Sequence, residues 1–143
     1  MKKIALAAVL AVCILLVMSC KSLGKVNDDS FNRIYNKYAN DLILDGATQY
    51  TVRSGDRLVD IAAAQYNDPY YYPVIMLASR NVVADPDKIQ PGMVLTVPNL
   101  QRNLNNQSSR AAIKGVINDC VSIESKRNRP DTAAGLRARA NSL

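Results

Sequence analysis

The sequence predicts an α+β domain in which two antiparallel strands pack on two helices, in the order strand, helix, helix, strand. This pattern occupies residues 50–99. Apolar residues alternate with polar ones at both ends of the stretch, which is the two-residue period of a half-buried strand. Between the strands, apolar residues at helical spacing are interrupted by Asn67-Asp68-Pro69, a sequence that stops a helix.

The first strand is predicted at residues 50–53, where Tyr50 and Val52 alternate with polar neighbours. Gly55 follows, and glycine tolerates the positive φ of a tight turn. We expect the side chain of Asp56 to cap the first helix by accepting a backbone N–H. The apolar positions of that helix are Leu58, Ile61, Ala62 and Tyr66.

The second helix is predicted from Pro73 to Asn81. Proline suits a first helical position because its φ is already set and no hydrogen bond is lost there. Asn81 is expected to close the helix in the left-handed conformation. The three tyrosines before this helix divide in the prediction: Tyr72 packs at the helix start, while Tyr70 and Tyr71 stay partly exposed.

The last strand is predicted at residues 94–97. The loop before it contains two turn dipeptides, Asp85-Pro86 and Pro91-Gly92. Leu95 and Val97 should face the core, and the proline that follows should end the pairing.

These segments resemble the lysin motif, the LysM domain. The resemblance rests on YTVRSGDRL at the start of the stretch, IA inside the first helix and DPDKIQPGMVLTVP at its end. It implies a βααβ fold and binding of glycans that contain N-acetylglucosamine. The family usually has Thr or Ser where Arg57 stands, and its longer variant more often has Trp where Tyr72 stands.

The resemblance also implies a glycan groove between the loop after the first strand and the loop before the last. The matching positions here are Ser54, Gly55, Asp56, Arg57, Leu58, Lys88, Ile89, Gln90 and Pro91. Such a groove needs exposed backbone N–H and C=O groups above an apolar floor. Ordinary structural roles exist for the same residues: Gly55 turns the chain, Leu58 and Ile89 fill the core, and for Asp56 the helix cap is favoured over ligand contact.

The N-terminus predicts export. Lys2 and Lys3 precede an apolar run that ends at Ser19-Cys20, and the run is too short for a convincing membrane span. Residues 17–20 resemble a lipobox, which implies a lipoprotein signal peptide at 1–19 and acylation of Cys20. A plain secretory peptide cut elsewhere is the alternative. Lys21 stands where an Asp would resemble an inner-membrane retention signal, which favours the outer membrane.

Residues 20–49 are predicted to form a tether and an amphipathic helix over about 29–44, ended by Gly46. We favour packing of its apolar stripe on the chain's own core over binding of a partner. The stripe consists of Phe31, Ile34, Tyr35, Tyr38 and Leu42.

Residues 100–143 are predicted to form a helical hairpin after a polar link at 103–107. Ser108 or Ser109 should cap its long helix, and Asp131 should cap a last short one. Cys120 is expected to behave as a small buried apolar residue. We interpret the hairpin as a packing accessory.

Composition argues against an enzyme. The chain has no histidine and no tryptophan, and Glu124 is its one glutamate. The usual general bases, zinc ligand sets and Cys/His pairs cannot be assembled, so no catalytic residue, metal site or cofactor is expected.

The net charge is +6, with much of the surplus beyond Asn99. For an exported chain these cations suit lipid headgroups, acidic peptidoglycan stems or a protein rather than nucleic acid, and a solvated helical face is the default. They are Arg102, Arg110, Lys114, Lys126, Arg127, Arg129, Arg137 and Arg139.

The combined expectation is a cell-envelope lipoprotein, anchored to a membrane by its lipid, that binds peptidoglycan or a similar N-acetylglucosamine polymer without cleaving it. The alternative is an envelope scaffold that captures a protein partner through its flanking helices. In that alternative the helices that bear Phe31, Tyr35, Ile113 and Ile117 dock onto the partner through the exposed members of their apolar stripes.

Overall fold

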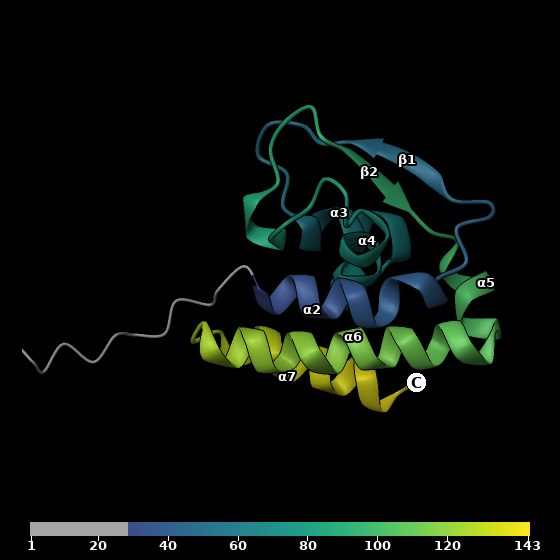
Figure 1. The fold of residues 1–143 in the computed structure, drawn as a ribbon. Helices are drawn as coiled ribbons and strands as arrows, with labels where there is room; N and C mark the ends of the chain where they lie inside the picture. Colours follow the sequence, from purple (N-terminus) through teal and green to yellow (C-terminus); the bar gives the residue numbers. More distant parts are fainter. Residues whose placement is uncertain (1–28) are drawn as a thin grey trace, which may run out of the picture.

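The computed structural model describes residues 29–143 of the chain. The predicted signal peptide at 1–19, the lipidation site Cys20 and the first part of the tether therefore lie outside the described residues. Within the described part, a small sheet lies on one side, and α3 (Leu58–Tyr66) and α4 (Tyr72–Ala78) lie beneath it. The helices α2 (Asp29–Tyr38), α6 (Gln107–Lys126) and α7 (Pro130–Asn141) form the opposite side, and α4 contacts both α2 and α6 (Figure 1).

The sheet pairs β1 (Thr48–Thr51) with β2 (Val94–Val97) in antiparallel register, with Tyr50 opposite Leu95. The last strand lies where the sequence predicts it, and Leu95 and Val97 are buried. The first strand begins two residues before the predicted start and ends at Thr51, so its predicted bounds are wrong. Two polar residues open it, and they give no alternating apolar signal.

The chain between the strands forms α3 (Leu58–Tyr66), a short 3₁₀ helix η2 (Pro69–Tyr71) and α4 (Tyr72–Ala78). Asn67 ends α3 in the left-handed conformation, with φ of 56°. Asn81 does not have a positive φ, so its predicted role is wrong. A left-handed asparagine does end a helix here, but the residue is Asn67 and the helix is α3.

Ser79 joins α4 to the outer edge of β2. Its hydroxyl accepts from the Thr96 backbone N–H at 2.9 Å and donates to the Thr96 carbonyl at 3.3 Å. A side chain thus satisfies strand groups that would otherwise face an unpaired edge.

On the N-terminal side, α2 (Asp29–Tyr38) continues into a 3₁₀ helix, η1 (Ala39–Asp41). Its apolar stripe packs on α6 and α4, and Phe31, Ile34, Tyr35 and Leu42 are buried. Self-packing of the stripe is therefore confirmed. The Tyr35 hydroxyl also donates to the Val83 carbonyl at 2.5 Å, which ties α2 to the loop after α4.

The C-terminal side contains α5 (Leu100–Asn105), α6 (Gln107–Lys126) and α7 (Pro130–Asn141), and α6 and α7 form a hairpin. The predicted polar link is wrong because most of it is helical. Asn99 caps α5, which was not predicted, and Asn106 caps α6 in place of the predicted Ser108 or Ser109. Pro130 occupies the start of α7, so Asp131 lies inside the helix rather than at its cap.

Two buried polar residues explain these differences. Asn103 donates to the Ile43 carbonyl at 2.9 Å and accepts from the Ile43 N–H at 2.8 Å, which fixes α5 against the segment before β1. The Ser109 hydroxyl donates to the Asp41 carbonyl at 2.7 Å instead of capping α6. Both side chains are fully enclosed, and both satisfy backbone groups of the N-terminal side.

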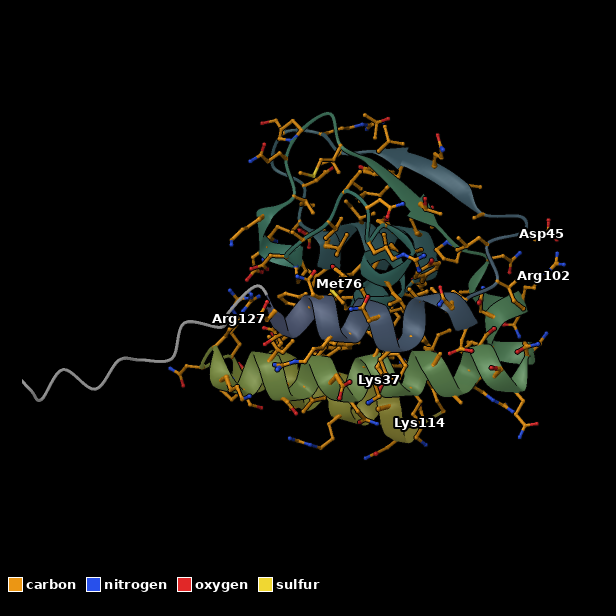
Figure 2. All side chains as sticks on the ribbon, in the orientation of Figure 1. Lys37, Asp45, Met76, Arg102, Lys114 and Arg127 are labelled. Carbon is orange, nitrogen blue, oxygen red and sulfur yellow. The ribbon has the colours of Figure 1, made fainter. Side chains whose placement is uncertain are left out.

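Cys120 is buried in α6, as predicted, and burial raises the pKa of its thiol to about 12. Met76 of α4 lies in the interior between the layers, whereas Arg102 and Asp45 form an ion pair at the surface (Figure 2). Within residues 29–143, none of the helices combines the length and apolar character needed to cross a bilayer.

Candidate functional site

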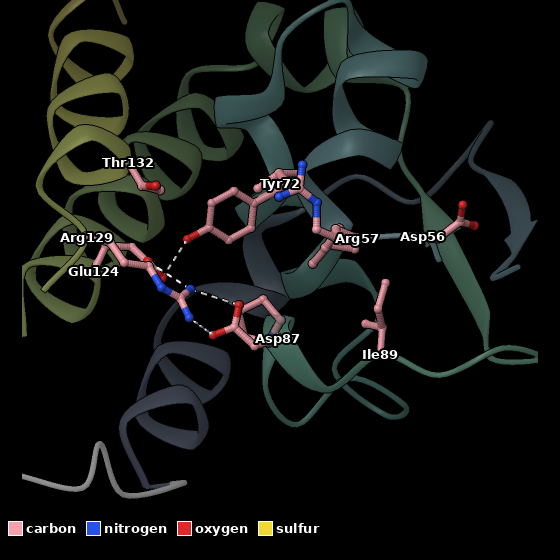
Figure 3. Close-up of a pocket in the computed structure, with 11 residues that line it drawn as sticks. Asp56, Arg57, Tyr72, Asp87, Ile89, Glu124, Arg129 and Thr132 are labelled. Atoms are coloured by element: carbon pink, nitrogen blue, oxygen red, sulfur yellow. Dashed lines mark hydrogen bonds and ion pairs between the residues drawn. The ribbon is translucent and has the colours of Figure 1, made fainter. Parts of the chain in front are cut away.

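A pocket of about 330 Å³ opens where the two predicted loops meet the corner between α6 and α7 (Figure 3). That volume lies at the small end of the range for small-molecule sites. The lining residues are Asp56, Arg57, Leu58, Val59, Tyr72, Pro86, Asp87, Ile89, Glu124, Arg129 and Thr132.

Backbone hydrogen bonds beyond the sheet hold the two loops together. The Val52 N–H donates to the Met93 carbonyl at 2.8 Å, and the Gly92 N–H donates to the Val52 carbonyl at 2.9 Å. These bonds therefore fix the start of the loop after β1 against the end of the loop before β2. Val52, predicted as a strand residue, acts instead as the last paired position before the loops separate.

The first loop is closed by Asp56. Its carboxylate accepts from the Arg53 N–H at 2.8 Å and from the Tyr50 hydroxyl at 2.7 Å. These bonds lower the pKa of Asp56, the backbone N–H having the larger effect. The predicted helix cap is wrong, because Asp56 closes a turn in which Gly55 has φ of 88°.

Arg57 stands at the N-cap of α3 and makes no capping bond with its side chain. Its guanidinium instead pairs with Asp60, at 2.7 and 2.9 Å, on the exposed rim of the pocket. Leu58 next to it is buried and contributes to the apolar floor. This arrangement leaves the first backbone N–H groups of α3 without a side-chain cap.

The second loop contains a 3₁₀ turn, η3 (Pro86–Lys88), whose N-cap is Asp85. The Asp85 carboxylate accepts from the Asp87 N–H at 3.0 Å. Ile89 is half-buried and lines the pocket opposite the start of α3. Lys88, Gln90 and Pro91 are exposed on the same loop but do not line the pocket.

The structure thus brings together Asp56, Arg57, Leu58 and Ile89 from the predicted groove. Ser54 and Gly55 are exposed on the first loop but, with the three exposed residues of the second, lie outside the lining. Their role in binding a glycan stays a prediction.

The far wall comes from the C-terminal hairpin and was missed by the sequence reasoning. Glu124 and Arg129 lie at the α6–α7 corner, and Thr132 lies in the first turn of α7 (Figure 3). Arg129 donates to Asp87 at 2.7 and 2.9 Å. These residues are far along the chain from Asp56, and no local motif marks them as part of the same pocket.

Tyrosines connect the hairpin to the loops. Tyr72 is buried, and its hydroxyl donates to Glu124 at 3.4 Å; burial is the main cause that raises the pKa of both groups. Tyr71 is also buried, with the Arg139 guanidinium 5.0 Å from its ring centroid, so its predicted exposure is wrong. Tyr70 is half-buried, as predicted.

Several basic residues of the C-terminal side are committed to acidic residues of the loops. Arg127 pairs with Asp85 and Asp87, and Arg139 pairs with Asp68. Together with Arg129 they attach the hairpin, which accounts for part of the basic surplus without any external partner. Within residues 29–143 no group of three potential metal-ligating side chains could hold a metal ion.

The comparisons agree with this geometry. The model of the LysM domain family matches residues 50–98. The chain is 43% identical over 49 residues to the potassium binding protein Kbp of Escherichia coli, which covers 34% of this chain and 33% of Kbp. It is 45% identical over 56 residues to an esterase of Mycobacterium tuberculosis, covering 39% of this chain and 12% of that protein.

A protein of Deinococcus radiodurans is 45% identical over 53 residues, covering 37% of this chain and 20% of that protein. No solved structure gives a significant match. Each relative is thus matched over a third of its length or less, in a stretch the size of one small module. The family match, the antiparallel pair of strands and the two helices between them identify residues 50–98 as a LysM domain.

Proposed function

We propose that this protein binds peptidoglycan, through the N-acetylglucosamine units of its glycan strands, without cleaving them. A LysM domain is a binding module, and such domains bind N-acetylglucosamine polymers. The observation that carries the proposal is the pocket between the two loops, floored by Leu58 and Ile89. An apolar floor beside exposed main-chain polar groups suits a sugar face and its acetamido group.

The proposal includes the cell envelope as the place of action. The lipobox-like residues 17–20 and the short apolar run before them support a lipid anchor at Cys20, with the outer membrane favoured by Lys21. One small pocket binds weakly by itself. A membrane anchor beside a polymeric target raises the effective concentration, so weak contact suffices for retention.

The scaffold alternative depends on apolar side chains that the structure places in the core. Phe31, Tyr35, Ile113 and Ile117 are all buried in the core formed by α2, α4 and α6. A partner cannot reach these side chains without unfolding the protein. Capture of a partner through this stripe is therefore not proposed.

Retention on purified, insoluble peptidoglycan tests the proposal. The full chain in mild detergent should sediment with the wall at moderate salt and be released by soluble N-acetylglucosamine oligomers. Ile89→Asp, which places a charge on the pocket floor, should reduce retention at least tenfold. Val94→Asp is the matched control, because Val94 is 45% exposed on β2 and lies outside the pocket.

If the wild-type protein stays in the supernatant at moderate salt, the proposal is rejected. Equal loss for Ile89→Asp and Val94→Asp would reject the assignment of the pocket. Release of soluble wall fragments during the incubation would reject the non-catalytic part.

A further inference from the structure

Glu124 is an unusual member of the pocket wall. Its exposed fraction is 2%, yet it lines the pocket. The hydrogen bonds to its carboxyl group are long, at 3.4 Å from the Tyr72 hydroxyl and 3.3 Å from Arg129, and Arg127 lies 3.8 Å away. A buried carboxyl group normally has short, well-formed bonds, whereas those of Glu124 are long. Because a carboxylate can accept several hydrogen bonds, Glu124 retains capacity to accept from a donor in the pocket.

Arg129 provides the complementary donors. Its shortest bonds go to Asp87, at 2.7 and 2.9 Å, and hold the guanidinium in place against the second loop. A guanidinium carries five N–H groups. Three of them are directed at Asp87 and Glu124, while 45% of the side chain remains exposed, so donors remain available beside the pocket.

Thr132 adds a hydroxyl on the same wall, from the first turn of α7. Figure 3 shows Glu124, Arg129 and Thr132 on the hairpin side, away from Asp56 and Ile89. The pocket therefore has two chemically distinct parts. One is the groove between the LysM loops, and the other is a charged corner supplied by residues outside the LysM domain.

An N-acetylglucosamine polymer offers the guanidinium and the carboxyl group only neutral hydroxyl and acetamido groups. A peptide that ends in a free carboxylate also offers an ionised acceptor, which bonds an arginine more strongly than a neutral one, and its amide N–H groups can donate to a carboxylate. In peptidoglycan the glycan carries lactyl-linked peptide stems, which offer these groups next to the sugar ring.

We propose that Glu124, Arg129 and Thr132 form a subsite for the peptide stem, so that the protein prefers stem-bearing peptidoglycan over bare glycan strands. This inference rests on the proposed function, since the loops must first hold the sugar. The hairpin is then part of the binding site as well as a support for the fold. Arg129 and Thr132 donate to stem carbonyl or carboxylate oxygens, and Glu124 accepts from a stem amide.

The test compares two forms of the same wall: intact peptidoglycan, and peptidoglycan from which an amidase has removed the stems. Full-length protein in mild detergent should bind the intact form about tenfold more tightly, the size expected for one or two charge-assisted hydrogen bonds. Glu124→Gln, Arg129→Gln and Thr132→Val should each lower that ratio.

Arg129→Lys separates the ligand role from the structural one. It keeps the positive charge beside Asp87 but loses the planar donor fork, so it should retain the fold while lowering the ratio. Thermal unfolding followed by circular dichroism checks that each variant is folded. Thr132→Val is the least disruptive of them, because the hydroxyl that it removes has no hydrogen-bonding partner elsewhere in residues 29–143.

Equal wild-type affinity for intact and stripped walls would overturn the inference while leaving glycan binding in place. Variants that weaken binding to both forms in proportion would also overturn it, because a purely structural role gives that result. Failure to bind either form would instead reject the proposed function itself.

Discussion

The Arg127 guanidinium donates to the Asp85 carboxylate at 2.7 Å, and the two side chains are only 12% and 8% exposed. The pair joins the end of α6 to the loop before β2. Asp85 also holds the Asp87 N–H, so the conformation of that loop depends on a residue of the C-terminal side. The loop that lines the pocket is thus fixed from both ends, by β2 and by the hairpin.

Arg127→Met should strongly destabilise the protein, because it leaves the buried Asp85 carboxylate without its main partner. Breaking a buried ion pair by removing one partner costs about 3–5 kcal/mol of unfolding free energy. Denaturation in urea, followed by circular dichroism, measures the change. Arg102→Met is the matched control: its pair with Asp45 is exposed at the surface, and loss of such a pair costs less than about 1 kcal/mol.

Similar losses in the two variants would contradict this account. They would mean that Arg127 contributes no more than a surface cation.

The hydrogen bond between Tyr50 and Asp56 should affect how the stability of the fold depends on pH. The pKa of Asp56 is lowered in the folded protein, first by the Arg53 N–H and then by the Tyr50 hydroxyl. An acid with a lowered folded pKa stabilises the fold above its unfolded pKa, about 3.9, and this contribution is lost as the pH falls through the folded pKa. Tyr50→Phe should raise the pKa of Asp56 toward the ordinary value and reduce stability above about pH 4.

Carboxyl carbon chemical shifts, followed by NMR during a pH titration, give the Asp56 pKa directly. Asp131, for which the structure shows no bond to Tyr50, serves as the internal control. An unchanged Asp56 pKa in Tyr50→Phe would show that the hydroxyl bond does not form in solution.

The sequence predicted the order of elements and the position of β2 because local signals bound them. Pro91-Gly92 and Pro98 enclose the last strand, and the alternation of Leu95 and Val97 marks its buried face. The start of β1 had no such signal. Thr48 and Gln49 are polar, and they become a strand only because β2 offers its edge to them.

Helix α5, which was not predicted, illustrates a second limit of prediction from local sequence patterns. Its sequence is rich in asparagine, which on its own favours turns and caps. In the structure Asn99 supplies a cap, and Asn103 satisfies the backbone of Ile43 from inside the protein. The second contact joins residues 60 positions apart, so no local pattern predicts it.

The pocket was predicted in part for the same reason. The loop residues carry the family motif, and four of them line the pocket. Glu124 and Arg129 enter it through the docking of the hairpin, which depends on ion pairs with Asp85, Asp87 and Asp68. Opposite charges far apart in a sequence do not specify which of them will meet.

For Gly115→Ala we expect a change in stability opposite in sign to the one that helix propensity alone predicts. Alanine in place of glycine inside a helix normally stabilises by about 1 kcal/mol. A methyl group at Gly115 of α6 would overlap the ring of Tyr38, whose hydroxyl is held by Asp119 at 3.0 Å. We therefore expect Gly115→Ala to destabilise by about 1–3 kcal/mol, as overpacked sites do.

The double-mutant cycle provides the control for this prediction. In a Tyr38→Ala background the overlap is absent, so Gly115→Ala should become stabilising by about 1 kcal/mol in urea denaturation. The same sign of effect in both backgrounds would contradict the packing explanation.

The isolated LysM domain should not fold stably. α4 packs on α3 and β2 within the domain, but also on α2 and α6 outside it, and all its residues from Tyr72 to Leu77 are buried. Removal of both flanks exposes part of this surface, and each fully buried large apolar side chain contributes about 1.5–3 kcal/mol. Uncovering two or three of them is comparable with the whole stability of a small domain.

Residues 50–98 expressed alone should therefore show the poorly dispersed amide NMR spectrum of an unfolded chain, while residues 29–143 should show a folded one. Adding residues 29–49 to the domain is an informative intermediate, because it restores α2 but not α6 or the pairs from Arg127 and Arg129 to the second loop. A folded spectrum for 50–98 would mean that α4 needs no cover from the flanks. The pocket-lining loops would then be fixed by the domain alone, and the hairpin would act on the pocket only through the side chains that line it.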